Sequence, residues 1–323
     1  MNACVNTVGS TVSRSAQPVH RLQGIRFPGR DYRLPAFYMV TMTTLGRKRL
    51  FATCANDKST LNADGWLVYE LWHRMASDYP LIETSTLVIM PDHLHGLVRV
   101  KERMEKPVGV PLRAFKSQVT SALRKRFGDP ERKIWTPGYH DLAVWRRGAL
   151  SAYIRYMMDN PRRYCLKKAN PNLFSRVNGL RHPRLPEGET WSGYGNLFLL
   201  DKPEIRALKV SRTIEPNRLD ALRKDCLDWV RGMNGVIVSP FISPGEKELA
   251  RAALDAGGSV ILIKPDGFDR YFKPRGRYFD LCRQGRLLIL ACRPPSPAAV
   301  ALSRDMCLAM NRWCAAMAGD AFG

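Results

Sequence analysis

Residues 88–99 read Val-Ile-Met-Pro-Asp-His-Leu-His-Gly-Leu-Val-Arg, and this stretch decides how the first part of the chain folds. It predicts an apolar strand, a tight turn at Pro91-Asp92 and a second strand that begins at His93. Side chains alternate between the faces of a strand, so His93 and His95 share one face while Leu94 packs into a core on the other. Two imidazoles side by side are able to hold one metal ion, although such a pair is more often an ordinary strand face.

The segments on either side of this hairpin complete a first domain. A run of β-branched and aromatic residues begins at Phe37, and residues 63–78 repeat apolar side chains at helical spacing. The order β-α-β-β-α-β-α predicts a ferredoxin-like unit, an antiparallel sheet with helices on one face. The expected strands lie near 37–44, 84–90, 93–99 and 139–145, and the expected helices at 63–78, 110–127 and 149–159.

Short, wholly apolar strands alternate with helices in the second half of the chain. This pattern is typical of a parallel sheet covered on both faces. Ser243 and Glu246 form a capping-box pattern with Pro244 at the first helical position. The half resembles the Rossmann-type domains of DNA-processing and nucleotide-sensing proteins but lacks their glycine-rich phosphate loop, so we expect an accessory DNA- or nucleotide-binding domain of unknown ligand. The expected strands lie near 235–239, 259–263 and 287–292, and the helices near 217–231, 244–256 and 297–317.

These patterns predict an α+β domain followed by a smaller α/β Rossmann-like domain. Residues 1–30 form a basic flexible tail, residues 31–178 the first domain, residues 179–195 a linker rich in proline and glycine, and residues 196–323 the second domain.

The charge of the chain points to a polyanionic partner. The 323 residues carry a net charge of +22, which favours nucleic acid over a small neutral ligand. We expect no membrane partner, because the apolar runs are shorter than the ~18 residues of a spanning helix. We find no signal peptide and expect a cytoplasmic, nucleoid-associated protein. The eight cysteines include no C-x-x-C pair and are expected to be reduced thiols.

The positive charge is concentrated in the first domain. Residues 101–170 hold 17 Lys or Arg against 6 Asp or Glu, a net of +11 and therefore half of the excess. Aromatic residues lie among these charges, a mixture that suits single strands because unstacked bases need flat partners. The candidate DNA-binding residues are Arg113, Lys116, Arg124, Lys125, Arg126, Arg146, Arg147 and Arg155.

A candidate nucleophile lies in the last helix of this domain. If residues 149–160 are helical until Pro161 ends the helix, Tyr156 and Asn160 lie one turn apart on the same face. A phenol oxygen and an amide oxygen are then close together. Tyr153, three residues before Tyr156, lies near the same face and is a second candidate for the nucleophile.

Three motifs give the chain its resemblance to a known family. They are Met-Pro-Asp-His-Leu-His-Gly at 90–96, Trp-Thr-Pro-Gly-Tyr-His-Asp at 135–141, and Tyr156 followed by Asn160-Pro161. With the opening strand that follows Asp31, residues 30–175 resemble the REP-associated tyrosine transposases, which are relatives of the single-strand transposases within the HUH endonucleases.

The resemblance implies an enzyme that cuts and rejoins single-stranded DNA near hairpin-forming repeats through a 5′-phosphotyrosine. It implies that Tyr156 is the nucleophile and that His93, His95 and Asn160 hold Mg²⁺ or Mn²⁺. The implied partner is a hairpin-forming single strand, and a homodimer is allowed. The alternative is a basic nucleic-acid-binding protein without catalytic activity.

The sequence departs from the family pattern at two positions. Met157 follows Tyr156 where the family commonly has isoleucine, and the Tyr-Ile pair is found at Tyr153 instead. We still prefer Tyr156, because the residue four positions after Tyr153 is a methionine, a poor ligand for magnesium. Leu142 stands where relatives often carry a second histidine, so His140 is expected to be structural or to face phosphate.

Overall fold

The computed structural model describes residues 30–144, 148–269, 272–294 and 302–322. The chain divides into two compact units, one formed by Met1–Ala52 and Leu61–Met157 and the other by Thr53–Thr60 and Met158–Gly323. The division therefore falls earlier than residue 178. Most of the basic tail that the sequence predicts, residues 1–29, lies outside the described residues.

The first unit contains a four-stranded antiparallel sheet in the order β4-β5-β1-β6. Its strand and helix positions agree closely with those that the sequence predicts. The elements are β1 (Ala36–Thr43), the 3-10 helix η1 (Leu45–Arg47), α1 (Ala63–Asp78), β4 (Ile82–Met90), β5 (His93–Val100), α2 (Gly109–Phe127), β6 (His140–Val144) and α3 (Ala149–Met158).

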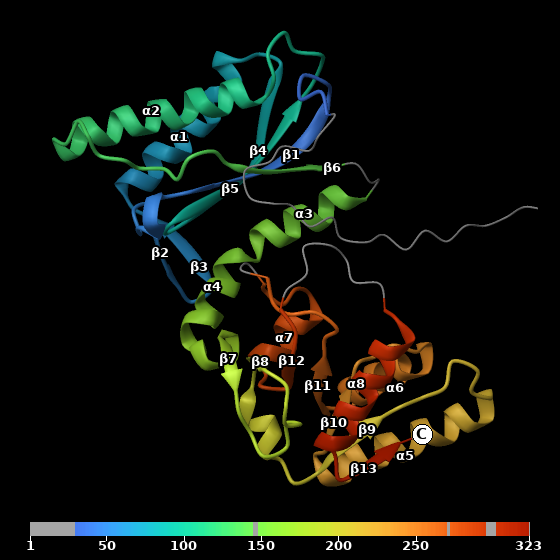
Figure 1. Ribbon diagram of the computed structural model, residues 1–323. Coiled ribbons are helices and arrows are strands. Elements are labelled where there is room, and N and C mark those ends of the chain that lie inside the picture. The colour runs from blue at the N-terminus through green and yellow to red at the C-terminus, as the bar shows by residue number, and fades with distance from the viewer. Residues whose placement is uncertain (1–29, 145–147, 270–271, 295–301, 323) are drawn as a thin grey trace, which may run out of the picture. The chain divides into compact units, whose positions relative to one another are not determined.

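Helices α1 and α2 cover one face of this sheet (Figure 1). Trp72 of α1 and Phe115 of α2 meet edge to face, with ring centroids 5.2 Å apart, and both pack with Leu94 of β5 in one apolar core. Helix α3 lies on the other face, where its Tyr156 ring meets His95. The expectation that all helices lie on one face is therefore wrong. The core side of the sheet is filled by α1 and α2, which leaves only the histidine side for a third helix.

Gly96 allows α1 to approach β5 closely. A Cβ atom at this position would lie 2.2 Å from Cζ2 and 2.3 Å from Cη2 of Trp72, far closer than two carbon atoms can pack. The indole of Trp72 is fully buried and fills the space over the strand. The glycine after the two histidines is thus required by packing on the face opposite to them.

A β-bulge interrupts β4. Thr84 pairs with Val98, but Leu87 pairs with Gly96, so the register between these two strands shifts by one residue. Because of this shift, Ile82 and Ile89 both face the core although their numbers differ in parity.

The second unit contains a seven-stranded mixed sheet in the order β13-β9-β10-β11-β12-β8-β7. The strands from β13 to β12 are parallel, while β8 and β7 are added antiparallel at one edge. The strands are β7 (Arg176–Leu180), β8 (Trp191–Gly195), β9 (Ile205–Leu208), β10 (Val236–Ser239), β11 (Ser259–Ile263), β12 (Leu287–Ala291) and β13 (Asp320–Phe322). The stretch 179–195, predicted as a linker, therefore includes β8 and forms part of this sheet.

Helices cover both faces of the sheet, as the sequence predicts. Trp229, Leu249 and Leu281 belong to the core on one face, and Met310 and Trp313 to the core on the other. The helices are α4 (Asn160–Ala169), η2 (Pro171–Phe174), η3 (Leu197–Asp201), α5 (Pro216–Met233), α6 (Pro244–Asp255), α7 (Arg277–Arg283) and α8 (Arg304–Met317).

One local prediction can be compared with the structure here, and one local feature is new. The capping box is confirmed, because Glu246 N donates to Ser243 Oγ and the Glu246 carboxylate accepts from Ser243 N. A two-stranded ribbon, β2 (Ala52–Ala55) with β3 (Lys58–Leu61), was not predicted. It turns at Asn56 and Asp57, which both have positive φ.

Two expectations from composition concern reduced cysteines and the absence of membrane-spanning helices. The seven cysteines within the described residues are all free thiols. None of the helices in this part of the chain combines the length and apolar composition that crossing a lipid bilayer demands.

Candidate functional site

The two histidines of β5 project from the face of the sheet that α1 and α2 leave open. Leu94 between them is fully buried in the core, and His95 is 6% exposed. The ring centroids of His93 and His95 lie 4.9 Å apart, and the ring planes are nearly perpendicular. The structure therefore brings the two imidazoles together on one face, as the alternation of the strand predicts.

Each imidazole is held through its Nδ1 atom. His93 Nδ1 lies 2.6 Å from Asp92 Oδ1, and His95 Nδ1 lies 2.8 Å from Thr41 Oγ1. Thr41 reaches His95 because the two residues are paired across β1 and β5. When Nδ1 donates to an oxygen, Nε2 becomes the ring atom that coordinates a metal, and histidine ligands in metalloproteins are usually oriented in this way. The two rings therefore fit a divalent cation.

Asp92 carries negative charge to the edge of this site. Burial tends to raise the pKa of its carboxyl group, but the hydrogen bond with His93 and the charges of His93 and Arg47 outweigh burial and lower the pKa below its ordinary value. Arg47 Nη1 lies 3.4 Å from Asp92 Oδ2. Neither Asp92 nor Thr41 was predicted as a site residue, although an acidic residue directly before the first histidine is a visible signal.

Two histidines alone do not complete the coordination of a metal ion. Within the described parts of the chain, no three His, Cys, Asp or Glu side chains gather closely enough to hold one. A cation bound to His93 and His95 would therefore need other oxygen ligands, such as an amide, water or a phosphate group.

Tyr156 of α3 faces the histidine pair. Its ring centroid lies 6.0 Å from that of His95, and the tyrosine is 41% exposed. The next residue, Met157, is fully buried and anchors the helix. Tyr153, one turn earlier, is half-buried, and within the described residues the tyrosine ring that meets His95, edge to face, is that of Tyr156. The structure thus places an accessible phenol next to the histidines.

Pro161 does not end the helix, contrary to the prediction from the sequence. Helix α3 ends at Met158, Asp159 keeps a helical backbone, and Asn160 begins α4 with Pro161 in its first turn. Proline is well suited to this position because the first turn of a helix needs no N–H donor from it. Asn160 belongs to the second unit, and its role as a metal ligand stays a prediction.

His140 lies in the same transverse row of the sheet as His95. Residues paired across antiparallel strands point to the same face, and Thr41 of β1 pairs with His95 on one side and with His140 on the other. His140 is exposed, whereas its neighbour Asp141 is buried. The register therefore places His140 on the histidine face, two strands from His95.

Three of the basic residues predicted to bind DNA hold α2 in place. Lys116 Nζ donates to the carbonyl oxygens of Thr136 at 2.8 Å and Gly138 at 2.6 Å, and burial lowers the pKa of Lys116. Arg124 donates to the Arg132 carbonyl, and Arg126 pairs with Asp64 at 3.1 Å. These side chains therefore have structural partners.

The other predicted DNA-binding residues lie in different places. Arg113 and Lys125 are exposed on α2, which covers the face opposite to the histidines. Arg155 is exposed on α3, directly before Tyr156. Arg146 and Arg147 lie outside the described residues. Of the described members of the set, Arg155 is the one whose element lies on the histidine face.

Comparisons with known proteins give distant likenesses. No family model matches the chain. An uncharacterized protein of Haemophilus influenzae is 25% identical over 163 residues, which cover 44% of this chain and 89% of that protein.

The solved structures that resemble parts of the chain include three with named activities or ligands. A REP-associated tyrosine transposase bound to a REP hairpin matches 43% of this chain and 74% of its own, with 18% identity and a TM-score of 0.34. A putative transposase from Deinococcus radiodurans matches 41% and 98%, with 18% identity and a TM-score of 0.28. The single-stranded-DNA-binding DNA processing protein A of Helicobacter pylori matches 46% and 68%, with 19% identity and a TM-score of 0.35. These scores are low, so the likenesses do not assign the chain to a family.

Proposed function

We propose that the first unit is an HUH-type tyrosine endonuclease that cuts single-stranded DNA near hairpin-forming repeats and rejoins it. The observation that carries this proposal is the position of Tyr156, whose ring lies 6.0 Å from His95 while His95 lies 4.9 Å from His93. The antiparallel sheet order β4-β5-β1-β6 supports it further, because this is the order of a ferredoxin-like β-α-β-β-α-β unit. The three motifs at 90–96, 135–141 and 156–161 agree with the same family.

Mg²⁺ or Mn²⁺ is the cofactor of this proposal. His93 and His95 would hold the ion through Nε2, because Asp92 and Thr41 engage the Nδ1 atoms. When bound, the cation polarises the scissile phosphate and offsets the charge that develops on its oxygens.

Tyr156 would act as the nucleophile. Its Oη atom forms a bond to phosphorus as the bond from phosphorus to the 3′-oxygen breaks, giving a 5′-phosphotyrosine and a free 3′-OH. The phenol loses a proton and the departing 3′-oxygen gains one, so the cleavage involves no net change in protons. Reversal of these steps with another 3′-OH rejoins the strand. The exposure of Tyr156 lets a DNA strand reach the hydroxyl.

The charge of the chain supports nucleic acid as the substrate. Phosphate contacts supply most of the affinity of such proteins, and Arg155 presents a positive charge beside Tyr156. Exposed basic residues on α2 extend the positive surface around the first unit. The second unit is proposed as an accessory domain.

A covalent adduct tests this function directly. The full-length protein is incubated with 5′- and 3′-labelled hairpin-containing single strands and Mg²⁺ or Mn²⁺, and denaturing gels should show a protein-linked DNA that EDTA prevents. Tyr156→Phe should abolish the adduct, because only one hydroxyl is lost, while Tyr153→Phe is the matched control and should keep most activity. An adduct mapped to Tyr153 by peptide mass spectrometry would refute the assignment.

The histidines provide a second arm of the same test. His93→Ala and His95→Ala should abolish cleavage but keep much of the affinity for DNA, because affinity depends on dispersed phosphate contacts. Equal loss of cleavage and binding would show that the pair is structural.

A nucleic-acid-binding protein without catalysis is the second candidate. It is favoured by the net charge of +22, which requires no reaction. Tight binding over a broad set of oligonucleotides, with no adduct under any metal condition, would support it over the endonuclease.

A further inference from the structure

The second unit contains a cavity at the carboxyl end of its parallel strands. Its volume is about 830 Å³, and it is lined by the loop that follows β9, by the start of α6 and by one side of α8. The sheet changes direction at β9, since β10, β11 and β12 follow on one side of it and β13 is added on the other. Open α/β sheets bind ligands in the crevice at such a switch point. The volume is also that of a small-molecule site.

Glu246 occupies the position in this cavity where an anion would otherwise bind. Its side chain is 3% exposed. Oε1 accepts from Val210 N at 3.3 Å, and Oε2 accepts from Ile242 N at 2.6 Å and from Ser243 N at 3.2 Å. Backbone N–H groups around a helix start commonly bind phosphate in folds of this type. Because the protein's own carboxylate uses them here, recognition of an external phosphate must come from side chains.

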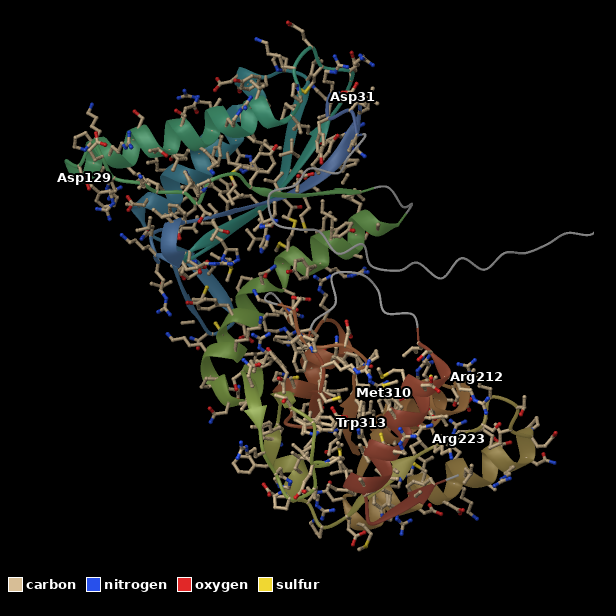
Figure 2. The ribbon with its side chains drawn as sticks, in the orientation of Figure 1. Asp31, Asp129, Arg212, Arg223, Met310 and Trp313 are labelled. Atoms are coloured by element: carbon tan, nitrogen blue, oxygen red, sulfur yellow. The ribbon has the colours of Figure 1, made fainter. Side chains whose placement is uncertain are left out.

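Four basic side chains surround the mouth of the cavity. Lys209, Arg212, Arg218 and Arg304 are exposed, and within the described residues none of them has a carboxylate partner. Arg223, farther along α5, is different because it lies 3.6 Å from Glu248. Arg212 and Arg223 are both labelled in Figure 2.

The charge around the cavity is therefore unbalanced. Two acidic residues also line it, Glu215 and the buried Glu246, so the lining keeps an excess of two positive charges. Like charges that lie close together repel one another, and a bound phosphate would relieve this repulsion.

The wall of the cavity is apolar. Ile214, Ile242 and Leu302 line it together with the buried Val210. A ligand that fits both the basic mouth and the apolar wall has a phosphate at one end and a flat, weakly polar group at the other. A sugar phosphate lacks the second feature, whereas a nucleotide has both.

We propose that this cavity binds a nucleotide the size of a nucleoside mono- or diphosphate. The phosphate contacts Arg212, Arg218 and Arg304, and the base packs against Ile214 and Leu302. The site lies wholly within the second unit and is independent of the DNA cleavage proposed for the first.

Calorimetric titration of the full-length protein with nucleotides tests the proposal. The probes are the mono- and diphosphates of adenosine, guanosine, cytidine and uridine, with inorganic phosphate and the free nucleosides as controls. We expect at least one nucleotide to bind more tightly than either control. The double variant Arg212→Gln/Arg304→Gln should weaken binding at least about tenfold, as expected for lost charge-assisted hydrogen bonds. The matched control Arg223→Gln should bind like the wild type.

Cys307 offers a readout that does not depend on any variant. It lines the cavity and is half-buried, as are Cys54 and Cys165, which do not line it. A bound nucleotide should slow alkylation of Cys307 while leaving Cys54 and Cys165 unchanged, which peptide mass spectrometry measures.

Four results would overturn the proposal. They are no binding of any of the eight nucleotides at millimolar concentration, equal weakening by Arg223→Gln, binding without protection of Cys307, and binding of an oligothymidylate at these arginines without binding of nucleotides. The last result would identify the cavity as a contact for a DNA strand.

Discussion

Replacing Gly96 by alanine should destabilise the first unit and disturb the two histidines that precede it on β5. The new Cβ would lie 2.2, 2.3 and 2.9 Å from three atoms of the Trp72 ring. Trp72 cannot move away freely, because it is fully buried and packs edge to face on Phe115 at 5.2 Å. Overpacking of this kind costs about 1–3 kcal/mol. For a unit of this size, a loss of ~2 kcal/mol lowers the melting temperature by roughly 4–8 °C.

Calorimetry of the full-length protein measures this change, and hydrogen exchange followed by mass spectrometry assigns it to a unit. Exchange should accelerate in peptides covering β5 and its partner β1. Gly232→Ala is the matched control, because nothing lies within 4 Å of the added Cβ and the position is within α5. That change should be neutral or stabilise the second unit by up to about 1 kcal/mol. An unchanged melting temperature and unchanged exchange in β5 for Gly96→Ala would show that the contact with Trp72 is not a constraint.

Two further predictions concern single side chains. Thr41→Val removes the hydroxyl that lies 2.8 Å from His95 Nδ1 and should lower metal affinity and cleavage about 10- to 100-fold. The control Thr41→Ser keeps a hydroxyl and should retain both properties. Equal activity of the two variants would show that the hydroxyl does not orient the ring. Lys167 has a pKa lowered from 10.5 to about 8 by burial and by the nearby charges of Lys273 and Arg163, so the unfolded chain binds the extra proton between those values and stability should rise with pH from about 8 to 10.5. The urea unfolding midpoints of the wild type and of Lys167→Met are measured at pH 8, 9 and 10. The midpoint of the wild type minus that of the variant should rise with pH, and a flat or falling difference would contradict the prediction.

The first unit was largely predictable because its signals are local. The apolar run before Pro91 fixed the hairpin, and the helical spacing of residues 63–78 gave α1 with the observed bounds. The partner of His95 was not predictable in the same way. Thr41 lies 54 residues before His95, and only the register between β1 and β5 brings them together.

Three other features were not fully predicted, because each residue pattern is compatible with more than one local structure. Pro161 was taken as the end of a helix, although a proline in the second position of a helix fits its start equally well. The prediction that Glu246 caps α6 is confirmed, but its bond from Val210 N, which ties the loop after β9 to the first turn of α6 across 36 residues, was not predicted. Strand β8, Trp-Ser-Gly-Tyr-Gly, contains two glycines that indicate a loop. Its pairing with the apolar strand β12 overrides that preference.

The bulge in β4 should allow this hairpin to lose one residue without a change in the pairing of its other residues. Thr84 and Leu87 each keep their partner on β5, and one residue more than the partner strand needs lies between them. Deletion of Ser85 or Thr86 would leave a regular ladder in which every other side chain keeps its face. Deletion of Met90 would instead move Val88 and Ile89 one position toward the turn, so that Ile89 would pair with His93 and lie on the histidine face. Natural length variation in this hairpin should therefore be confined to residues 85 and 86.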